Sequence, residues 1–205
     1  MPCKVNLYPL LDNKFIEKTI EFVKSKLIGF DSGHDWWHIQ RVWQNAIYIN
    51  QFEKGNPEIV MLGALLHDIA DAKFHDGDEK IGPKIAREYL KKNHIDDATI
   101  EQVTKIIDHI SYKSNLGQVH FKSKELDIVQ DADRLDAMGA IGIARAFHYG
   151  GFKNREIYNP DIPSAANISK EEYKKSNAPT INHFYEKLLL LKDKMNTKTG
   201  KQLAE

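Results

Sequence analysis

Apolar residues recur every three or four positions along almost the whole chain, the spacing that places them on one face of an α-helix. No stretch of useful strand length alternates apolar and polar residues, and no internal repeat stands out. The pattern therefore predicts an all-α protein. The expected helices cover about 13–29, 35–53, 57–70, 82–93, 97–110, 125–136, 137–148 and 178–195.

The expected helix 57–70 differs from the others because it begins with Pro57 and is then apolar on nearly every face. Such a helix is surrounded by others, so we expect it at the centre of the fold. His67 and Asp68 stand at its C-terminal end. A buried, ionised carboxylate needs a partner. Either a metal ion provides it, or the pair is a capped core pair with His67 bonded to a carbonyl and Asp68 exposed.

Composition limits the function without identifying it. The chain of 205 residues is 41% hydrophobic, which is enough for one sizeable core and a single domain. Lys plus Arg equals Asp plus Glu at 29 each, so no net field draws the protein to a nucleic-acid polymer or an anionic membrane. The single cysteine, Cys3, and a start unlike a signal peptide favour a cytoplasmic location.

Two further groups of polar residues lie on expected helices. Asp35, His38 and Arg41 are three positions apart and share one face, although a lone histidine there is more often a core or surface residue than a ligand. Three acids crowd the expected helix 125–136, which usually means a solvated face. The apolar spacing of that helix places Asp133 beside the buried stripe, so we expect Asp133 to differ from its two acidic neighbours, Asp131 and Asp136.

Three motifs, taken in order, resemble a known family. They are GHDWWHIQRV with His38, LLHDIAD with His67 and Asp68, and QDADRLDAMGAIGIAR with Asp133. Together they resemble the H…HD…D pattern of the HD-domain metal-dependent phosphohydrolase superfamily over residues 33–148. The resemblance implies a compact helical bundle of the HD-domain type in which His38, His67, Asp68 and Asp133 hold the metal.

Two imidazoles and two carboxylates leave positions open on an octahedral ion, which favours Mn²⁺, with Fe²⁺, Co²⁺, Mg²⁺ or Ni²⁺ as other candidates, over a closed structural zinc site. Asp71 lies one helical turn beyond the doublet and is the expected catalytic acid or base, as in relatives; the alternative is an ordinary solvated Asp. The expected substrate-binding residues are Arg41, Lys73, His75, His109, Lys113, Arg145, Lys153 and Arg155. For His109 a substrate contact or indirect role is favoured over a second metal.

The stretch from residue 150 to 167 has no periodicity and is expected to be a loop. Gly150 and Gly151 permit a change of chain direction, after which Lys153 and Arg155 can meet substrate phosphates. The alternative is a surface loop packed by its own apolar side chains. We expect this loop to form one wall of the substrate site.

The segments beyond residue 148 look like a small bacterial branch of the superfamily, some of whose members are described as nucleotide pyrophosphohydrolases. The favoured reaction is therefore cleavage of a nucleoside or deoxynucleoside triphosphate to the monophosphate and pyrophosphate. A 5′-nucleotidase, a guanosine tetraphosphate hydrolase and a non-catalytic ligand-sensing domain stay open as alternatives. Chains of this branch continue past the GKQLAE segment with a further helix, whereas this sequence stops at Glu205. We expect this difference to bear on stability or on assembly into a homodimer, but not on the metal ligands.

Overall fold

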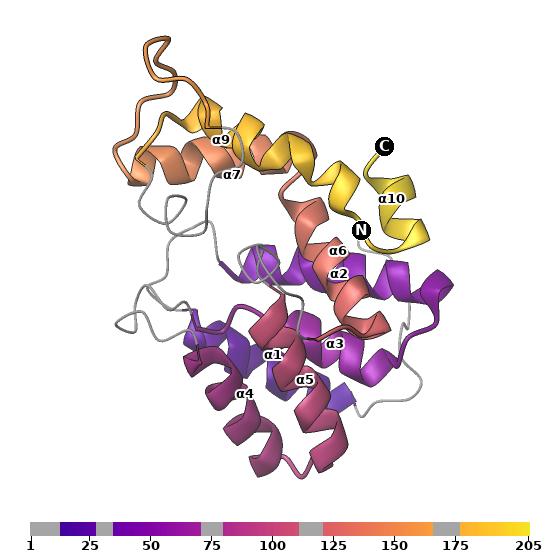
Figure 1. Cartoon of the computed structure of the whole chain (residues 1–205). Helices are drawn as coiled ribbons and strands as arrows, with labels where there is room; N and C mark the ends of the chain where they lie inside the picture. Colours follow the sequence, from indigo (N-terminus) through magenta and orange to yellow (C-terminus); the bar gives the residue numbers. More distant parts are fainter. Residues whose placement is uncertain (1–12, 28–34, 71–79, 111–120, 166–176) are drawn as a thin grey trace, which may run out of the picture.

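The structure is a computed structural model that describes residues 13–27, 35–70, 80–110, 121–165 and 177–205 (Figure 1). These residues form helices and no strand, so the predicted all-α fold is confirmed. None of the described helices is both long and apolar enough to cross a bilayer. The elements are α1 (Asn13–Lys26), α2 (Trp36–Glu53), α3 (Pro57–Leu66), α4 (Ile81–Lys92), α5 (Asp97–His109), α6 (Lys124–Asp136), α7 (Gly139–Phe152), α9 (Thr180–Glu186), η3 (Leu188–Leu190), η4 (Lys192–Lys194) and α10 (Lys198–Leu203).

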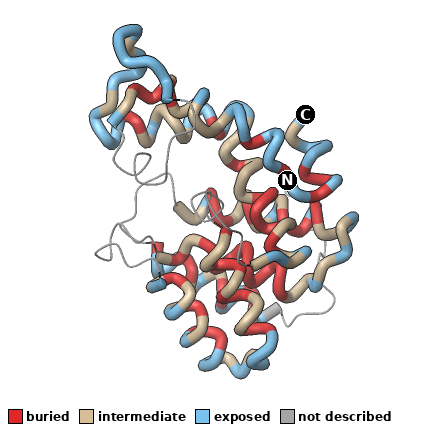
Figure 2. Tube along the Cα trace, in the orientation of Figure 1, coloured by how far each residue is buried: buried red, intermediate tan, exposed pale blue. Residues whose placement is uncertain are grey.

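Helix α3 lies at the centre of the bundle, as its apolar sequence predicts. Every residue from 59 to 66 is buried, and α1, α2, α5 and α6 pack around the helix (Figure 2). Its start is fixed by Asn56, whose side chain accepts hydrogen bonds from the backbone N–H groups of Glu58 and Ile59. The helix ends at Leu66, earlier than expected, so His67 and Asp68 lie just beyond its last turn.

Helices α2 and α6 lie side by side and carry the other two predicted ligand motifs. Asp35 caps α2 by accepting a hydrogen bond from the backbone N–H of His38. Ser123 caps α6 by accepting one from the backbone N–H of Leu126. Because each cap fixes where its helix starts, it also fixes the helical phase of the side chains that follow.

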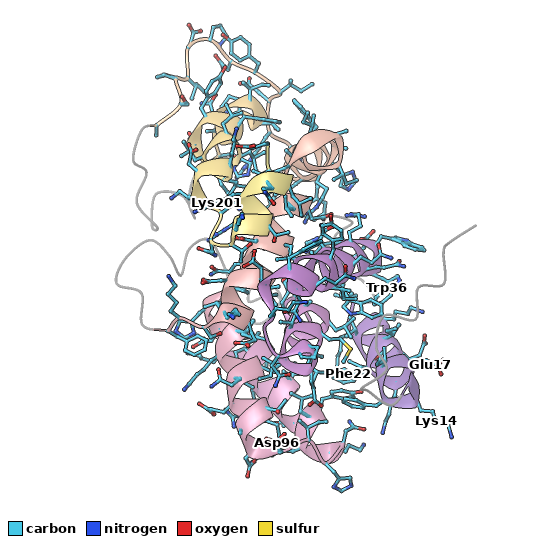
Figure 3. The ribbon with its side chains drawn as sticks, turned by 90° about the vertical axis from the view of Figure 1, so that its right-hand side faces the viewer. Lys14, Glu17, Phe22, Trp36, Asp96 and Lys201 are labelled. Carbon is cyan, nitrogen blue, oxygen red and sulfur yellow. The ribbon has the colours of Figure 1, made fainter. Side chains whose placement is uncertain are left out.

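Helix α1 covers one side of the bundle. Its Phe22 ring stacks on Tyr89 of α4 with ring centroids 3.9 Å apart. Lys14 and Glu17 on the same helix are exposed and point away from the bundle (Figure 3). This amphipathic division is the one that its sequence predicts.

Helices α7 and α9 lie together at the end of the molecule opposite to α4 and α5 (Figure 1). Helix α7 continues to Phe152, so the expectation that Gly150 and Gly151 turn the chain is wrong. Gly150 is buried, and a Cβ built on it would lie 2.1 Å from Oγ1 of Thr180. The glycine is therefore required for the close approach of α9 and not for a turn.

The single long helix expected over residues 178–195 is also wrong. Helix α9 ends at Glu186, where Lys187 leaves the helical conformation, and two short 3₁₀ segments follow. Leu191 and Met195 are buried within this tightened path. The chain then forms α10, which the sequence analysis did not predict and which packs on α2 and α6.

Candidate metal centre

Three of the predicted metal ligands meet where α2 begins and where α3 and α6 end. Nε2 of His38 lies 3.6 Å from Oδ1 of Asp133, and Nε2 of His67 lies 4.0 Å from the same oxygen. One donor atom from each of the three residues lies within 4.8 Å of the others. The two nitrogen–oxygen distances are too long for hydrogen bonds, yet the donor atoms are close enough to surround one ion.

His67 contributes an unprotonated ring nitrogen, Nε2, to this cluster. Its Nδ1–H donates to the carbonyl oxygen of Ala64 at 2.8 Å, so Nε2 carries the lone pair. Nε2 is buried, and none of the described residues provides it with a hydrogen-bond partner. Leaving a buried polar atom unsatisfied costs about 1–3 kcal/mol. A cation beside Asp133 would satisfy Nε2, so the residues present fit a metal ion.

His38 is held in a similar way, and its side chain is only 2% exposed. Its Nδ1–H donates to Oδ2 of Asp136 at 2.7 Å, which leaves Nε2 directed at Asp133. Burial lowers the pKa of His38 below its usual value, and this effect outweighs the Asp136 hydrogen bond that opposes it. The neutral imidazole is thereby favoured, which is the form that binds metals.

Asp68 stands at the margin of the cluster. Its Oδ2 lies 4.0 Å from Nε2 of His38, and its side chain is 24% exposed. The compact group of donor atoms contains His38, His67 and Asp133 but not Asp68. Ligation by Asp68 therefore stays a prediction.

The acids of α6 are buried in the opposite order to the one expected. Asp131 is fully buried and Asp136 is nearly so, whereas the side chain of Asp133 is 35% exposed. The expectation that Asp131 and Asp136 share a solvated face is wrong, because each is surrounded by donors from other elements. Asp131 accepts hydrogen bonds from the backbone N–H groups of Asn196 and Thr197, ahead of α10.

Asp136 was not predicted as a site residue. It accepts hydrogen bonds from His38, from Arg41 and from Arg145. Burial alone raises the pKa of Asp136, but its hydrogen bonds to His38 and Arg41, together with the charge of Arg145, lower it below its usual value. The available signal was its position three residues after Asp133, which places it one helical turn further along the same face.

Several predicted substrate contacts have neighbours close by in the sequence, and their contact with substrate stays a prediction. His109 donates from Nδ1–H to the carbonyl oxygen of Lys105 at 2.9 Å, and its ring lies against Phe121. Lys153 and Arg155 follow α7, and both lie over the ring of Tyr149. Asp71, Lys73, His75 and Lys113 lie outside the described residues.

A family model described as HD domain matches residues 36–138. The relative YpgQ of Bacillus subtilis (strain 168), an uncharacterized protein, is 36% identical over 194 residues, which cover 94% of this chain and 86% of YpgQ. The matched segment contains His38, His67, Asp68, Asp133 and Asp136.

Solved structures are similar over nearly the full length. A Lactobacillus plantarum protein superposes with a TM-score of 0.81 at 35% identity, covering 95% of this chain and 90% of that one. An HD-superfamily hydrolase of Bacillus thuringiensis is 45% identical, with a TM-score of 0.69 and coverage of 93% and 87%. Bacillus subtilis YpgQ in complex with ADP is 33% identical, with a TM-score of 0.69 and coverage of 92% and 87%.

Proposed function

This chain belongs to the HD-domain family, and from that premise we propose that it is a metal-dependent phosphohydrolase acting on a nucleotide. The observation that carries the proposal is the meeting of His38, His67 and Asp133 with donor atoms within 4.8 Å of one another. The buried Nε2 of His67, which has no hydrogen-bond partner among the described residues, supports it, because a cation bound there would satisfy that atom.

His38, His67 and Asp133 would hold the ion, with Asp68 as the fourth ligand. Two nitrogen and two oxygen donors in an open site favour Mn²⁺ among Mn²⁺, Fe²⁺, Co²⁺, Mg²⁺ and Ni²⁺. When bound, a divalent ion supplies an acidified water and polarises a phosphoryl oxygen.

Other residues of the chain would bind and orient the phosphate groups of the substrate. Arg41 uses Nε and Nη2 on Asp136, and its side chain is 35% exposed. A guanidinium has five N–H donors, so Arg41 retains capacity for a phosphate oxygen. Asp71 is the proposed catalytic acid or base, and Lys73, His75, His109, Lys113, Arg145, Lys153 and Arg155 are the further proposed contacts to substrate.

The favoured reaction is hydrolysis of a nucleoside or deoxynucleoside triphosphate to the monophosphate and pyrophosphate. Its support is the ADP in the YpgQ complex, since ADP shares the base, ribose and phosphate chain of such a substrate. A small phosphorylated partner also agrees with the balanced charge of the chain. Assembly into a homodimer stays a prediction.

The test is a product analysis on protein stripped of metal and then supplied with Mn²⁺. Triphosphates, diphosphates and monophosphates are each incubated, and orthophosphate and pyrophosphate are measured separately. We expect pyrophosphate and monophosphate from triphosphates, with no turnover in EDTA. Orthophosphate from monophosphates alone would indicate a 5′-nucleotidase. Metal binding without any turnover would favour a ligand-sensing domain.

A further inference from the structure

We infer that Asp136 is a positioning residue that aims Nε2 of His38 at the metal, and that Arg41 and Arg145 act by holding Asp136 in place. This inference rests on the metal site of the proposed function. It concerns a carboxylate that is not one of the three residues whose donor atoms form the cluster.

The carboxylate of Asp136 accepts hydrogen bonds from side chains on two other helices, α2 and α7. Its Oδ2 lies 2.7 Å from Nδ1 of His38, 2.8 Å from Nη1 of Arg145 and 3.0 Å from Nη2 of Arg41. Its Oδ1 accepts a further hydrogen bond from Nε of Arg41. The side chain is 1% exposed, so water does not compete for these positions.

An ionised carboxylate only accepts hydrogen bonds, so the proton between Asp136 and His38 belongs to Nδ1 of the imidazole. The neutral ring then carries its lone pair on Nε2, the atom that lies 3.6 Å from Asp133. Metal-binding histidines commonly donate their other N–H to a carboxylate, which fixes both tautomer and ring orientation. Asp136 does this for His38, as the Ala64 carbonyl does for His67.

The two arginines hold the carboxylate of Asp136 from two different helices, α2 and α7. Arg41 lies on α2 one turn after His38 and grips Asp136 with two donors. Arg145 reaches across from α7 and donates both to the carboxylate and to the backbone carbonyl of Asp136. The orientation of His38 is thus determined by contacts from α2, α6 and α7 together.

A matched control lies on the same helix. Asp131 is a buried carboxylate of α6 that accepts hydrogen bonds from the C-terminal segment, at Asn196 and Thr197. If buried acids of α6 served only to stabilise the fold, Asp131→Asn and Asp136→Asn would have the same consequences. A positioning role predicts that only Asp136→Asn changes His38 and the metal.

The first measurement is the tautomer of His38 by nitrogen NMR of the imidazoles in metal-free protein at neutral pH. We expect the Nδ1–H form in the wild-type protein and in Asp131→Asn. In Asp136→Asn the amide can donate to Nδ1, so we expect a shift towards the Nε2–H form. A wild-type His38 in the Nε2–H form, or no change in Asp136→Asn, would overturn the inference.

The second measurement is the affinity for Mn²⁺ by calorimetry. We expect Asp136→Asn to bind about 10- to 100-fold more weakly, the usual effect of losing such a partner, and Asp131→Asn to bind as the wild type does. Arg145→Met should weaken binding less, and Asp136→Asn/Arg145→Met should be no weaker than Asp136→Asn alone, because Arg145 acts through Asp136.

The outcomes separate the two proposals. Wild-type protein that binds no divalent ion overturns the proposed function and this role with it. Wild-type protein that binds Mn²⁺ while Asp136→Asn binds it equally well overturns the role and leaves the proposed function standing. If Asp136→Asn does not fold, Arg145→Met keeps the test decisive, since unchanged affinity in that variant contradicts the part given to Arg145.

Discussion

Nδ1 of His67, the residue that follows α3, lies 2.8 Å from the carbonyl oxygen of Ala64 in the last turn of that helix. This short contact within one turn determines which ring nitrogen is left over, and the one left over is buried without a hydrogen bond among the described residues. The hydrogen bond at the end of α3 therefore leaves Nε2 of His67 as a buried lone pair, which a bound cation would satisfy.

Replacing His67 by Leu should separate stability from metal binding. Without metal, the variant loses the hydrogen bond to Ala64, worth about 1 kcal/mol, but also loses a buried unsatisfied nitrogen that costs about 1–3 kcal/mol. We expect little change in Tm in EDTA. Wild-type protein should gain about 2.7 kcal/mol at Mn²⁺ one hundred times above its Kd, and the variant should gain none. Calorimetric melting with and without Mn²⁺ checks this, and a full Mn²⁺ gain in the variant would contradict it.

Asp68 and Asp71 should differ in role although they are three residues apart. Asp68→Ala is expected to lose metal and activity together, because Asp68 is the proposed fourth ligand. Asp71→Asn is expected to keep the metal and to lose turnover by about 10²- to 10⁴-fold, the range for a general acid or base. Metal content by elemental analysis, measured beside kcat, distinguishes them. Loss of metal in Asp71→Asn would make Asp71 a ligand or a structural residue instead.

The fold was predictable because helical periodicity is local, whereas the roles of Asp131 and Asp136 were not. Asp136 is bonded to His38, 98 positions away in the chain. Whether an acid is solvated or buried depends on such distant donors, and the spacing within α6 indicates a shared face for Asp133 and Asp136 but not which donors meet them. The break at Lys187 was missed for a related reason. Leu188, Leu191 and Met195 fit a helical stripe whether or not the backbone tightens between them.

Distant neighbours also decide how a glycine responds to substitution by alanine. Gly200 and Gly151 should therefore differ, although the sequence does not distinguish them. In Gly200→Ala the new Cβ would lie 2.2 Å from Oδ2 of Asp131, so the hydrogen bonds that hold α10 must shift. We expect a loss of about 1–3 kcal/mol, as for overpacking in a core. Gly151 on α7 has nothing within 4 Å of a built Cβ, so Gly151→Ala should be neutral or stabilise by about 0.5–1 kcal/mol. Urea unfolding of both variants measures the difference, and equal effects would show that Asp131 yields easily.

His183 on α9 should make the stability of the protein depend on pH. Burial, helped by the charges of Lys187 and Arg155, lowers the pKa of His183 to about 4. In the unfolded chain the pKa of His183 is about 6.5. Between pH 6.5 and pH 4 the imidazole is therefore protonated in the unfolded state and neutral in the folded state. Stability should therefore fall as the pH drops from 7 through 6.5 towards 4.

The expected loss attributable to His183 between pH 7 and pH 5 is on the order of 1–2 kcal/mol. The measurement is urea unfolding in EDTA at both pH values, for the wild-type protein and for His183→Gln, so that metal binding does not contribute. Other titrating groups cancel in the difference between the two proteins. The substitution should reduce the pH dependence by that amount, whatever it does to stability at pH 7. An identical pH dependence in both proteins would mean that the imidazole is protonated in the fold without cost, which the desolvation that lowers the pKa of His183 argues against.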